Sequence, residues 1–232
     1  MAATIHIAAR DGHGDFTGYF ATPADGAHIA GIVVVQEIFG INADVRALAD
    51  GWAAQGYAAL APDLFWRLEP GVELDAEIPE QRDKAFGLYG RFDVDAAVAD
   101  IEASITALRA HGCTRVGVVG QCLGGLLAYL AATRTDSDAS VGYYGIGIDA
   151  RLGEASAIAR PLLLHIATRD GFVTPEAQAT VHAGLADNAR VTLFDYDADH
   201  AFARASGSAR VPALALQADE RTAAFFREHL AA

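Results

Sequence analysis

The chain has 232 residues, a length that suits one α/β domain and is short for two. Hydrophobic residues make up 52% and charged residues 20% of the chain, which is typical of a globular protein and excludes a disordered one. The formal net charge of −13 argues against nucleic acid or an anionic membrane as a partner, because both attract basic patches. We therefore expect residues 1–232 to form a single domain that acts on small molecules.

A predicted strand at residues 115–120 separates the two cysteines, Cys113 and Cys122. Six residues of strand span about 20 Å, which is beyond the reach of a disulfide. Free thiols indicate a reducing compartment. Residues 1–10 lack the basic start and apolar core of a signal peptide, and no apolar run is long enough to cross a membrane. We expect a cytoplasmic protein.

Strands and helices alternate along most of the chain. Residues 5–9 and 16–21 are predicted to form a hairpin. Further strands are expected at residues 29–35, 57–61, 115–120, 140–144, 161–167 and 190–196, and helices at 42–55, 94–110, 123–133, 174–185 and 212–229. This order is typical of an α/β fold, with a mostly parallel twisted sheet and helices on both faces. Ligands of such sheets bind at the carboxyl ends of the strands.

Residues 64–90 are less regular, since prolines and glycines recur among them at Pro70, Gly71, Pro79 and Gly90. We interpret this segment as an excursion from the sheet that lies beside the functional site.

The sequence Gly120-Gln-Cys122-Leu-Gly124 stands between a predicted strand and a predicted helix. The pattern G-x-C-x-G is the nucleophile elbow of the α/β-hydrolase fold, with cysteine in place of serine. The nucleophile of an elbow sits in a strained turn, so the two flanking glycines must lack a Cβ. The following helix points its first N–H groups at the sulfur, which favours the thiolate. Cys113 has no such setting, and we interpret it as structural.

In this fold the acid and the histidine follow the nucleophile in that order. Asp170 follows the strand at 161–167, and His200 follows the strand at 190–196, so both lie at the carboxyl edge of the sheet. We expect His200 to carry the proton of Cys122. Asp170 is expected to hold the imidazole in one tautomer and to stabilise the imidazolium.

The remaining histidines are weaker candidates for the base. His165 lies within a strand and is interpreted as a hydrogen-bonded core residue, and His182 lies within a helix. The nearby run Asp195, Asp197 and Asp199 raises the question of calcium. An EF-hand loop needs glycine at its sixth position and glutamate at its twelfth, where this chain has histidine and serine. We expect no metal and no cofactor.

The strand at residues 29–35 runs into Gln36-Glu37-Ile38-Phe39-Gly40. The loop after this strand commonly supplies one N–H of the oxyanion hole, and the residue after the nucleophile supplies the other. These positions are Ile38 and Leu123. Glu37 is unexpected at the edge of an apolar pocket, because a buried carboxylate is costly unless it is paired or protonated.

Several segments together resemble the dienelactone hydrolase (carboxymethylenebutenolidase) family, over residues 32–226. They are residues 36–40, 61–64, 81–93, 117–125, 141–145 and 200–204. The resemblance implies a Cys-His-Asp triad that opens a cyclic enol-lactone with a free carboxylate and gives maleylacetate, in the degradation of aromatic compounds. It also implies a monomer.

The resemblance further assigns roles to residues around the triad. Glu37 is implied to bond the resting Cys122 thiol and to take its proton when substrate binds. Arg82 and Arg204 are implied to bind the substrate carboxylate, which would create a local anion site on an acidic protein. Tyr144 is implied to belong to the substrate site.

This chain departs from the family pattern near Arg82. Phe86 replaces a pocket tyrosine, Tyr89 replaces a tryptophan one turn later, and Ala201 replaces a more polar residue. A lost hydroxyl removes a contact worth about 0.5–1.5 kcal/mol, so the substrate preference is the property most open to change. A broader carboxylesterase or thioesterase is therefore an alternative, and a non-catalytic ligand-binding protein of the same fold is a second.

Overall fold

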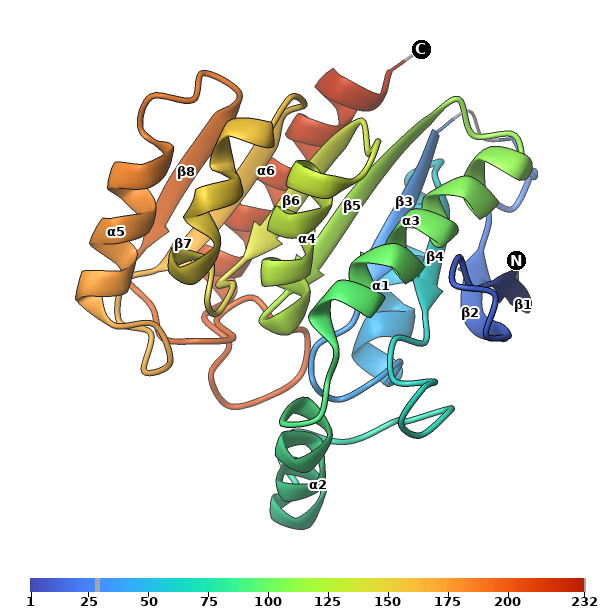
Figure 1. Cartoon of the computed structure of the whole chain (residues 1–232), viewed down its shortest axis with the longest axis horizontal. Coiled ribbons are helices and arrows are strands. Elements are labelled where there is room, and N and C mark those ends of the chain that lie inside the picture. Colours follow the sequence, from blue (N-terminus) through green and yellow to red (C-terminus); the bar gives the residue numbers. More distant parts are fainter. Residues whose placement is uncertain (28–29, 232) are drawn as a thin grey trace.

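The computed structural model describes residues 1–27 and 30–231. Within them, eight strands form one sheet in the order β1-β2-β4-β3-β5-β6-β7-β8 (Figure 1). The strands are β1 (Ala2–Ala8), β2 (Asp15–Ala21), β3 (Ala30–Val35), β4 (Ala58–Pro62), β5 (Arg115–Gln121), β6 (Ala139–Tyr143), β7 (Leu162–Ala167) and β8 (Val191–Tyr196). The first two strands pair antiparallel, as does β2 with β4, and all the other pairs are parallel. The mostly parallel α/β sheet expected from the sequence is confirmed.

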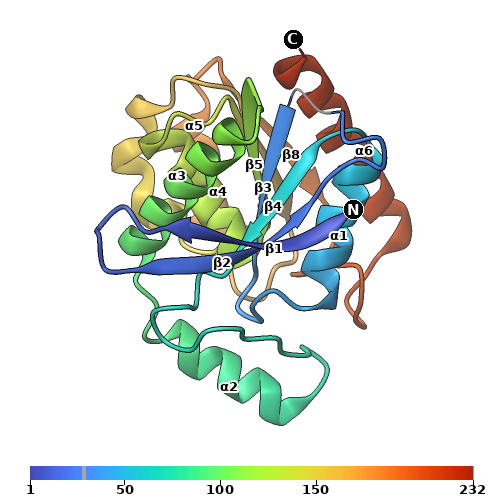
Figure 2. The ribbon, with the colours of Figure 1, turned by 90° about the vertical axis from the view of Figure 1, so that its right-hand side faces the viewer.

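Helices cover both faces of the sheet, as Figure 2 shows from the side. They are α1 (Ala43–Ala54), α2 (Pro79–Tyr89), α3 (Val94–Ala110), α4 (Leu123–Arg134), α5 (Pro175–Leu185) and α6 (Pro212–Leu230), with a 3-10 helix at Asp149–Ala157. The helices α3, α4 and α5 pack on one face, and α1 and α6 pack on the other. Alternate residues of β3 enter the two cores, Val33 and Val35 on one side and Ile32 and Val34 on the other. Because β3 is buried on both faces, its residues are all apolar or glycine, and this continuous apolar run is the pattern from which the strand was predicted.

Most predicted elements agree with the structure to within a few residues. Asn42 caps α1 as expected, since its side chain accepts the Val45 N–H at 3.2 Å. Ile29, the first residue of one predicted strand, lies outside the described residues. None of the described helices has the length and apolar character needed to cross a bilayer.

Two helical segments were not predicted. Residues 64–90 were expected to be irregular, yet α2 occupies the end of this segment and projects away from the sheet (Figures 1 and 2). This helix buries Ala85 and Leu88 alone, so it has no apolar stripe for a sequence pattern to reveal. The 3-10 helix at Asp149–Ala157 buries none of its residues, and it left no periodic signal for the same reason.

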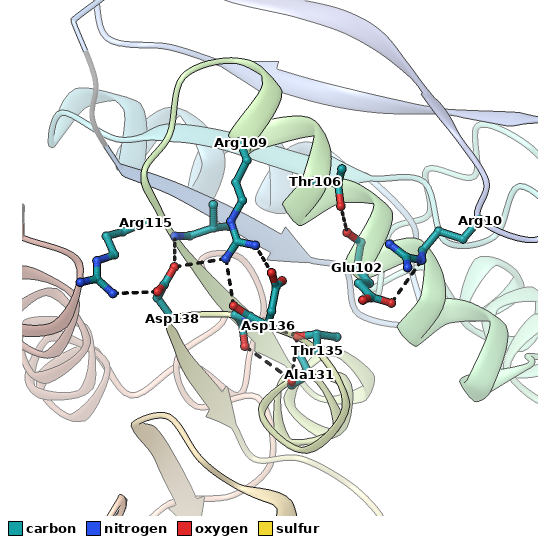
Figure 3. A network of polar contacts seen from close by, with 11 residues as sticks. Arg10, Glu102, Thr106, Arg109, Arg115, Ala131, Thr135, Asp136 and Asp138 are labelled. Carbon is teal, nitrogen blue, oxygen red and sulfur yellow. Dashed lines mark hydrogen bonds and ion pairs between the residues drawn. The ribbon is translucent and has the colours of Figure 1, made fainter.

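A charged network holds the end of the sheet that lies away from the carboxyl edge (Figure 3). Asp138, just before β6, accepts the Val116 N–H at 2.9 Å and hydrogen bonds from Arg115 at 3.0 Å and Arg109 at 3.4 Å. Asp136 also pairs with Arg109. The side chain of Asp138 is 8% exposed, whereas that of Asp136 is 61% exposed. Asp138 thus ties α3, β5 and β6 together from a buried position.

We expect Asp138→Asn to lower the free energy of unfolding by about 1–3 kcal/mol, because it weakens several charge-assisted hydrogen bonds of a buried group. Asp136→Asn is the matched control, and its solvent-exposed pair should contribute less than about 1 kcal/mol. Urea unfolding of both variants measures the difference. Equal losses in the two variants would contradict the distinction.

Candidate active site

The cysteine stands in the sharp turn that the sequence predicted. Cys122 lies between β5 and α4 with φ of 56° and ψ of −117°, a left-handed conformation. A Cβ on Gly120 would lie 2.3 Å from the Gly124 carbonyl oxygen, and one on Gly124 would lie 2.7 Å from that of Val35. Both flanking positions therefore require glycine, and the elbow is confirmed as a close approach of helix to strand.

The environment of Cys122 favours a neutral thiol. The residue is 7% exposed. Burial raises the thiol pKa most, and the negative charge of Glu37 raises it further, while the Leu123 N–H and Arg204 lower it less. The sequence predicted that the helix N-terminus would favour thiolate. The N–H group acts in that direction, but desolvation is the larger effect, so the resting thiol is protonated.

Asp170 and His200 are brought together as predicted. His200 Nδ1 and Asp170 Oδ2 are 2.8 Å apart, in a pair whose side chains are 11% and 1% exposed. The other carboxylate oxygen of Asp170 accepts the Phe172 N–H at 2.8 Å. Asp199 accepts the N–H groups of Gly171 and His200, which joins the two loops. Because Nδ1 is bound to a carboxylate, Nε2 is the ring nitrogen free to exchange protons in the cavity.

Cys122 and His200 both line one cavity, of about 380 Å³. In the part of the chain that the structure describes, no hydrogen bond joins the sulfur to His200 or to Glu37. The histidine–aspartate hydrogen bond of the expected triad is formed, whereas no hydrogen bond joins the cysteine to the histidine among the described residues.

Glu37 has a different partner from the one the resemblance implied. Its Oε2 accepts a hydrogen bond from Arg204 at 3.2 Å, and its Oε1 has no partner among the described residues. A guanidinium stabilises a buried carboxylate more than a neutral thiol does, which accounts for this choice. Burial nevertheless raises the pKa of Glu37, against the lowering by Arg204 and His200. Burial and Arg204 thus act in opposite directions on the pKa of a carboxylate that lies within electrostatic reach of the Cys122 thiol.

The cavity brings together most of the residues proposed for substrate binding. Both positions named for the oxyanion hole, Ile38 and Leu123, line it, as do Arg82, Phe86 and Arg204. Arg82 is exposed and forms no ion pair with any described residue, so its guanidinium is available to an anion. The geometry supports one free and one paired arginine at a single site.

Tyr144 is not brought to the cavity surface. Its ring packs edge-on against His200, with the centroids 5.0 Å apart, and against Phe202 at 5.6 Å. The residue is buried, and its hydroxyl has no partner among the described residues. The buried ring of Tyr144 therefore packs against the His200 imidazole from the protein interior.

Sequence reasoning missed an aromatic side chain at the mouth of the cavity. Phe172 is 57% exposed, lines the cavity, and lies edge-on to His200 with the centroids 4.9 Å apart. With Phe86 and Tyr89 it gives the mouth an apolar rim. Its position two residues after Asp170 was the available signal, since that loop must lie beside the base.

His165 is confirmed as a hydrogen-bonded core residue. Its Nδ1 lies 2.8 Å from the Tyr196 hydroxyl, and its Nε2 lies 2.9 Å from the Thr222 hydroxyl. Thr222 is in turn 2.6 Å from the Tyr143 hydroxyl. Burial lowers the pKa of His165 to about 3, with a smaller contribution from the charge of Arg221.

The two groups at the ends of this row of hydrogen bonds determine which atom donates in each bond. Arg221, which can only donate, bonds the Tyr196 hydroxyl at 3.0 Å, and Asp219 accepts from the Tyr143 hydroxyl at 3.1 Å. Each hydroxyl has one proton, so each group donates its hydrogen bond to the next group in the direction of Asp219. His165 must then accept at Nδ1 and donate from Nε2. This neutral tautomer is set by the network rather than by the catalytic residues.

Comparison with known proteins gives a consistent result. The profile of the dienelactone hydrolase family matches residues 16–230. A protein of Azospirillum brasilense, provisionally named a carboxymethylenebutenolidase, is 45% identical over 233 residues, which cover 97% of this chain and 98% of that protein. Carboxymethylenebutenolidase 1 of Cupriavidus pinatubonensis is 39% identical over 205 residues, covering 87% of this chain and 86% of that protein.

A solved structure supports the same fold. The crystal structure of a protein from Klebsiella pneumoniae, provisionally described as a dienelactone hydrolase, superposes with a TM-score of 0.82 at 25% identity. The match covers 97% of this chain and 98% of the other.

We expect Glu37→Gln to accelerate alkylation of the free protein by iodoacetamide at pH 8. The substitution removes the negative charge that raises the thiol pKa, and below that pKa each unit of decrease gives about ten times more thiolate. Mass spectrometry of the labelled peptide measures the rate at Cys122, with Cys122→Ala as the control for labelling elsewhere. An unchanged or slower rate would show that Glu37 does not restrain the thiol.

We expect stability to fall as the pH drops below about 6.5, partly because of His165. Its folded pKa is about 3 and its unfolded pKa is about 6.5, so the unfolded state binds the extra proton between these values. The contribution is fully present above pH 6.5 and decreases by about 1.4 kcal/mol per unit below it. Urea unfolding at pH 6 and pH 5 should therefore give a steeper pH dependence for the wild type than for His165→Gln. Identical slopes would contradict this assignment.

Proposed function

Because the chain belongs to the dienelactone hydrolase family, we propose that it opens a dienelactone to maleylacetate, with Cys122 as the nucleophile. One observation carries the proposal. A buried cysteine in a nucleophile elbow, an aspartate-paired histidine and two arginines all border one cavity of about 380 Å³. The cavity is large enough for a small lactone with one carboxylate. All of these groups lie on one chain, which is in keeping with a monomer.

In the first half of the proposed reaction, the substrate carboxylate binds Arg82 and competes with Glu37 for Arg204. Glu37 then takes the proton of Cys122, and the thiolate attacks the lactone carbonyl carbon. The N–H groups of Ile38 and Leu123 stabilise the oxyanion. The ring C–O bond breaks, and the leaving enolate takes the proton back from Glu37.

In the second half, His200 removes a proton from water, and the water oxygen attacks the thioester carbonyl carbon. The C–S bond breaks, and the leaving thiolate of Cys122 takes the proton from the imidazolium. Asp170 stabilises that imidazolium through the bond to Nδ1. The new carboxylic acid loses the other proton of the water to solvent and leaves as a carboxylate, and the protein returns to its starting protonation state.

The pairing of Glu37 with Arg204 supports substrate-dependent activation. The raised pKa of Cys122 makes the resting thiol a poor nucleophile and a poor target for oxidation. An anionic ligand that takes over Arg204 would leave Glu37 unpaired in a buried site, where a carboxylate most readily accepts a proton.

A broader esterase or thioesterase of the same family is the second candidate. The observation that favours it is the apolar rim, in which Phe86, Tyr89 and Phe172 are all partly exposed. Such a rim suits acyl or aryl groups larger than the unsubstituted lactone. The same nucleophile, base and oxyanion donors would serve both reactions.

A comparison of dienelactone with a neutral aryl acetate separates the two candidates. We expect Arg82→Ala to raise the KM for the lactone at least about tenfold, the cost of one charged hydrogen bond, and to leave the neutral ester unaffected. Arg91→Ala is the matched control, because Arg91 follows the same helix but does not line the cavity.

Three outcomes would count against the proposal. An unchanged apparent affinity for the lactone after removal of both Arg82 and Arg204 would disprove the carboxylate site. A preference of the wild type for the neutral ester would favour the broader esterase. Binding of the lactone without turnover would favour the non-catalytic alternative.

A further inference from the structure

The ion pair between Glu37 and Arg204 stands between two cavities. Both residues line the substrate cavity, and both also line a second cavity of about 210 Å³. The second cavity lies between α1, the end of β3 and the loop at residues 203–210. The pair is thus a partition with a chamber on each side, here called the substrate cavity and the rear cavity.

Polar residues stand among the apolar ones that line the rear cavity. Besides the partition, the polar residues are Asn42, Asp44, Gln121, Arg210 and Asp219. Asp44 raises the pKa of Glu37 from this side, whereas His200 lowers it from the substrate cavity. Glu37 is therefore within electrostatic reach of both chambers.

Two buried polar atoms without partners in the described part of the chain lie beside the rear cavity and the cavity next to it. Glu37 Oε1 and the Trp52 indole nitrogen, Nε1, are both buried and have no partner within the described ranges. Trp52 lines a third cavity of about 170 Å³, which shares Leu48, Gln121 and other residues with the rear cavity. Buried polar atoms of this kind are normally bonded to ordered water, and a volume of about 30 Å³ per molecule gives room for several. Water-binding groups thus extend from beneath α1 to the partition.

We propose that the rear cavity supplies the water that hydrolyses the acyl-enzyme, through the Glu37–Arg204 partition. This inference rests on the proposed function. During that step the acyl group occupies the substrate cavity, so it obstructs the path of water from the mouth to the thioester. The substrate carboxylate that takes over Arg204 also opens the partition, so acylation itself gives water access from behind.

The hydrolysis step uses His200 and Cys122 to move the proton of the water. Water that passes Glu37 gives one proton to His200 Nε2 while its oxygen bonds to the thioester carbonyl carbon. The C–S bond breaks, and the thiolate of Cys122 recovers the proton from His200. Glu37 positions the water at the end of the rear cavity and neither gains nor loses a proton in this step.

Leu48 is the site for the test, because it lines both the rear cavity and the third cavity and does not line the substrate cavity. Leu48→Trp fills the space and Leu48→Ala widens it. Leu216→Trp, on an exposed position of α6, is the control for adding a large side chain. Ala47→Leu, which narrows the same two cavities, is the second filling variant if Leu48→Trp does not fold.

The substrate for the test is the mono-4-nitrophenyl ester of fumaric acid, which has the carboxylate needed to engage Arg204. In stopped-flow experiments, release of nitrophenolate in the first turnover reports acylation, and the later steady rate reports deacylation. We expect the filling variants to lower the steady rate at least about fivefold while the first-turnover rate stays within about twofold. Leu48→Ala and Leu216→Trp should match or exceed the wild type in both.

An unchanged steady rate in the filling variants would overturn the inference. A proportional loss in both phases would overturn it too, since that pattern indicates general distortion of the site. Failure of the proposed function is recognised separately. If Cys122→Ala releases nitrophenolate in the first turnover as fast as the wild type, the nucleophile is wrong whatever the cavity variants show.

Discussion

A carboxylate and a thiol are both buried at the side of one cavity, and the other features of the site follow from that constraint. The charge of Glu37 and the burial of Cys122 both raise the thiol pKa, so the sulfur rests as a neutral group. Burial of Glu37 would be costly without Arg204, the paired cation 167 residues further along the chain. In the proposed reaction, a ligand that competes for that arginine leaves Glu37 free to take the proton of Cys122. The reactivity of the thiol then depends on the presence of an anionic substrate.

The fold delivers these groups to one place by simple topology. Four parallel strands, β3, β5, β7 and β8, end at the same edge of the sheet, and each is followed by one functional residue: Glu37, Cys122, Asp170 and His200. The elbow adds a local requirement, because glycine alone fits beside the turn. Behind the edge, Tyr144 supports the base, and the hydrogen-bonded chain through His165 ties the sheet to α6.

Much of this could be predicted from the sequence, where the signal was local. The run from Arg115 to Gly125 contains a strand, a turn and a helix start in one motif, so both the fold and the place of Cys122 in a sharp turn followed from it. The pairing of Asp170 with His200 followed from chain order and strand ends. The helix α2 was missed because its few buried residues make no periodic stripe. The side chains of Glu37 and Tyr144 could not be placed, since their contacts depend on residues far away in the chain.

Two of the three departures from the family pattern, Phe86 and Tyr89, lie at the mouth of the cavity, and the third, Ala201, is buried beside His200. Phe86 and Tyr89 come from α2, in which only Ala85 and Leu88 are buried, and they line the cavity together with Phe172 from the loop after β7. Under the proposed function, substitutions on α2 can therefore change the substrate preference and leave Cys122, Asp170 and His200 in place.

If Cys122 is the nucleophile, it forms a covalent acyl-enzyme with the lactone. Mass spectrometry of the protein after rapid acid quench during turnover, followed by peptide mapping, detects that species. A lactone loses no fragment when its ring opens, so we expect an adduct with the full mass of the substrate on the peptide that contains Cys122. Turnover with no adduct on that peptide, or with the adduct on another residue, would contradict it.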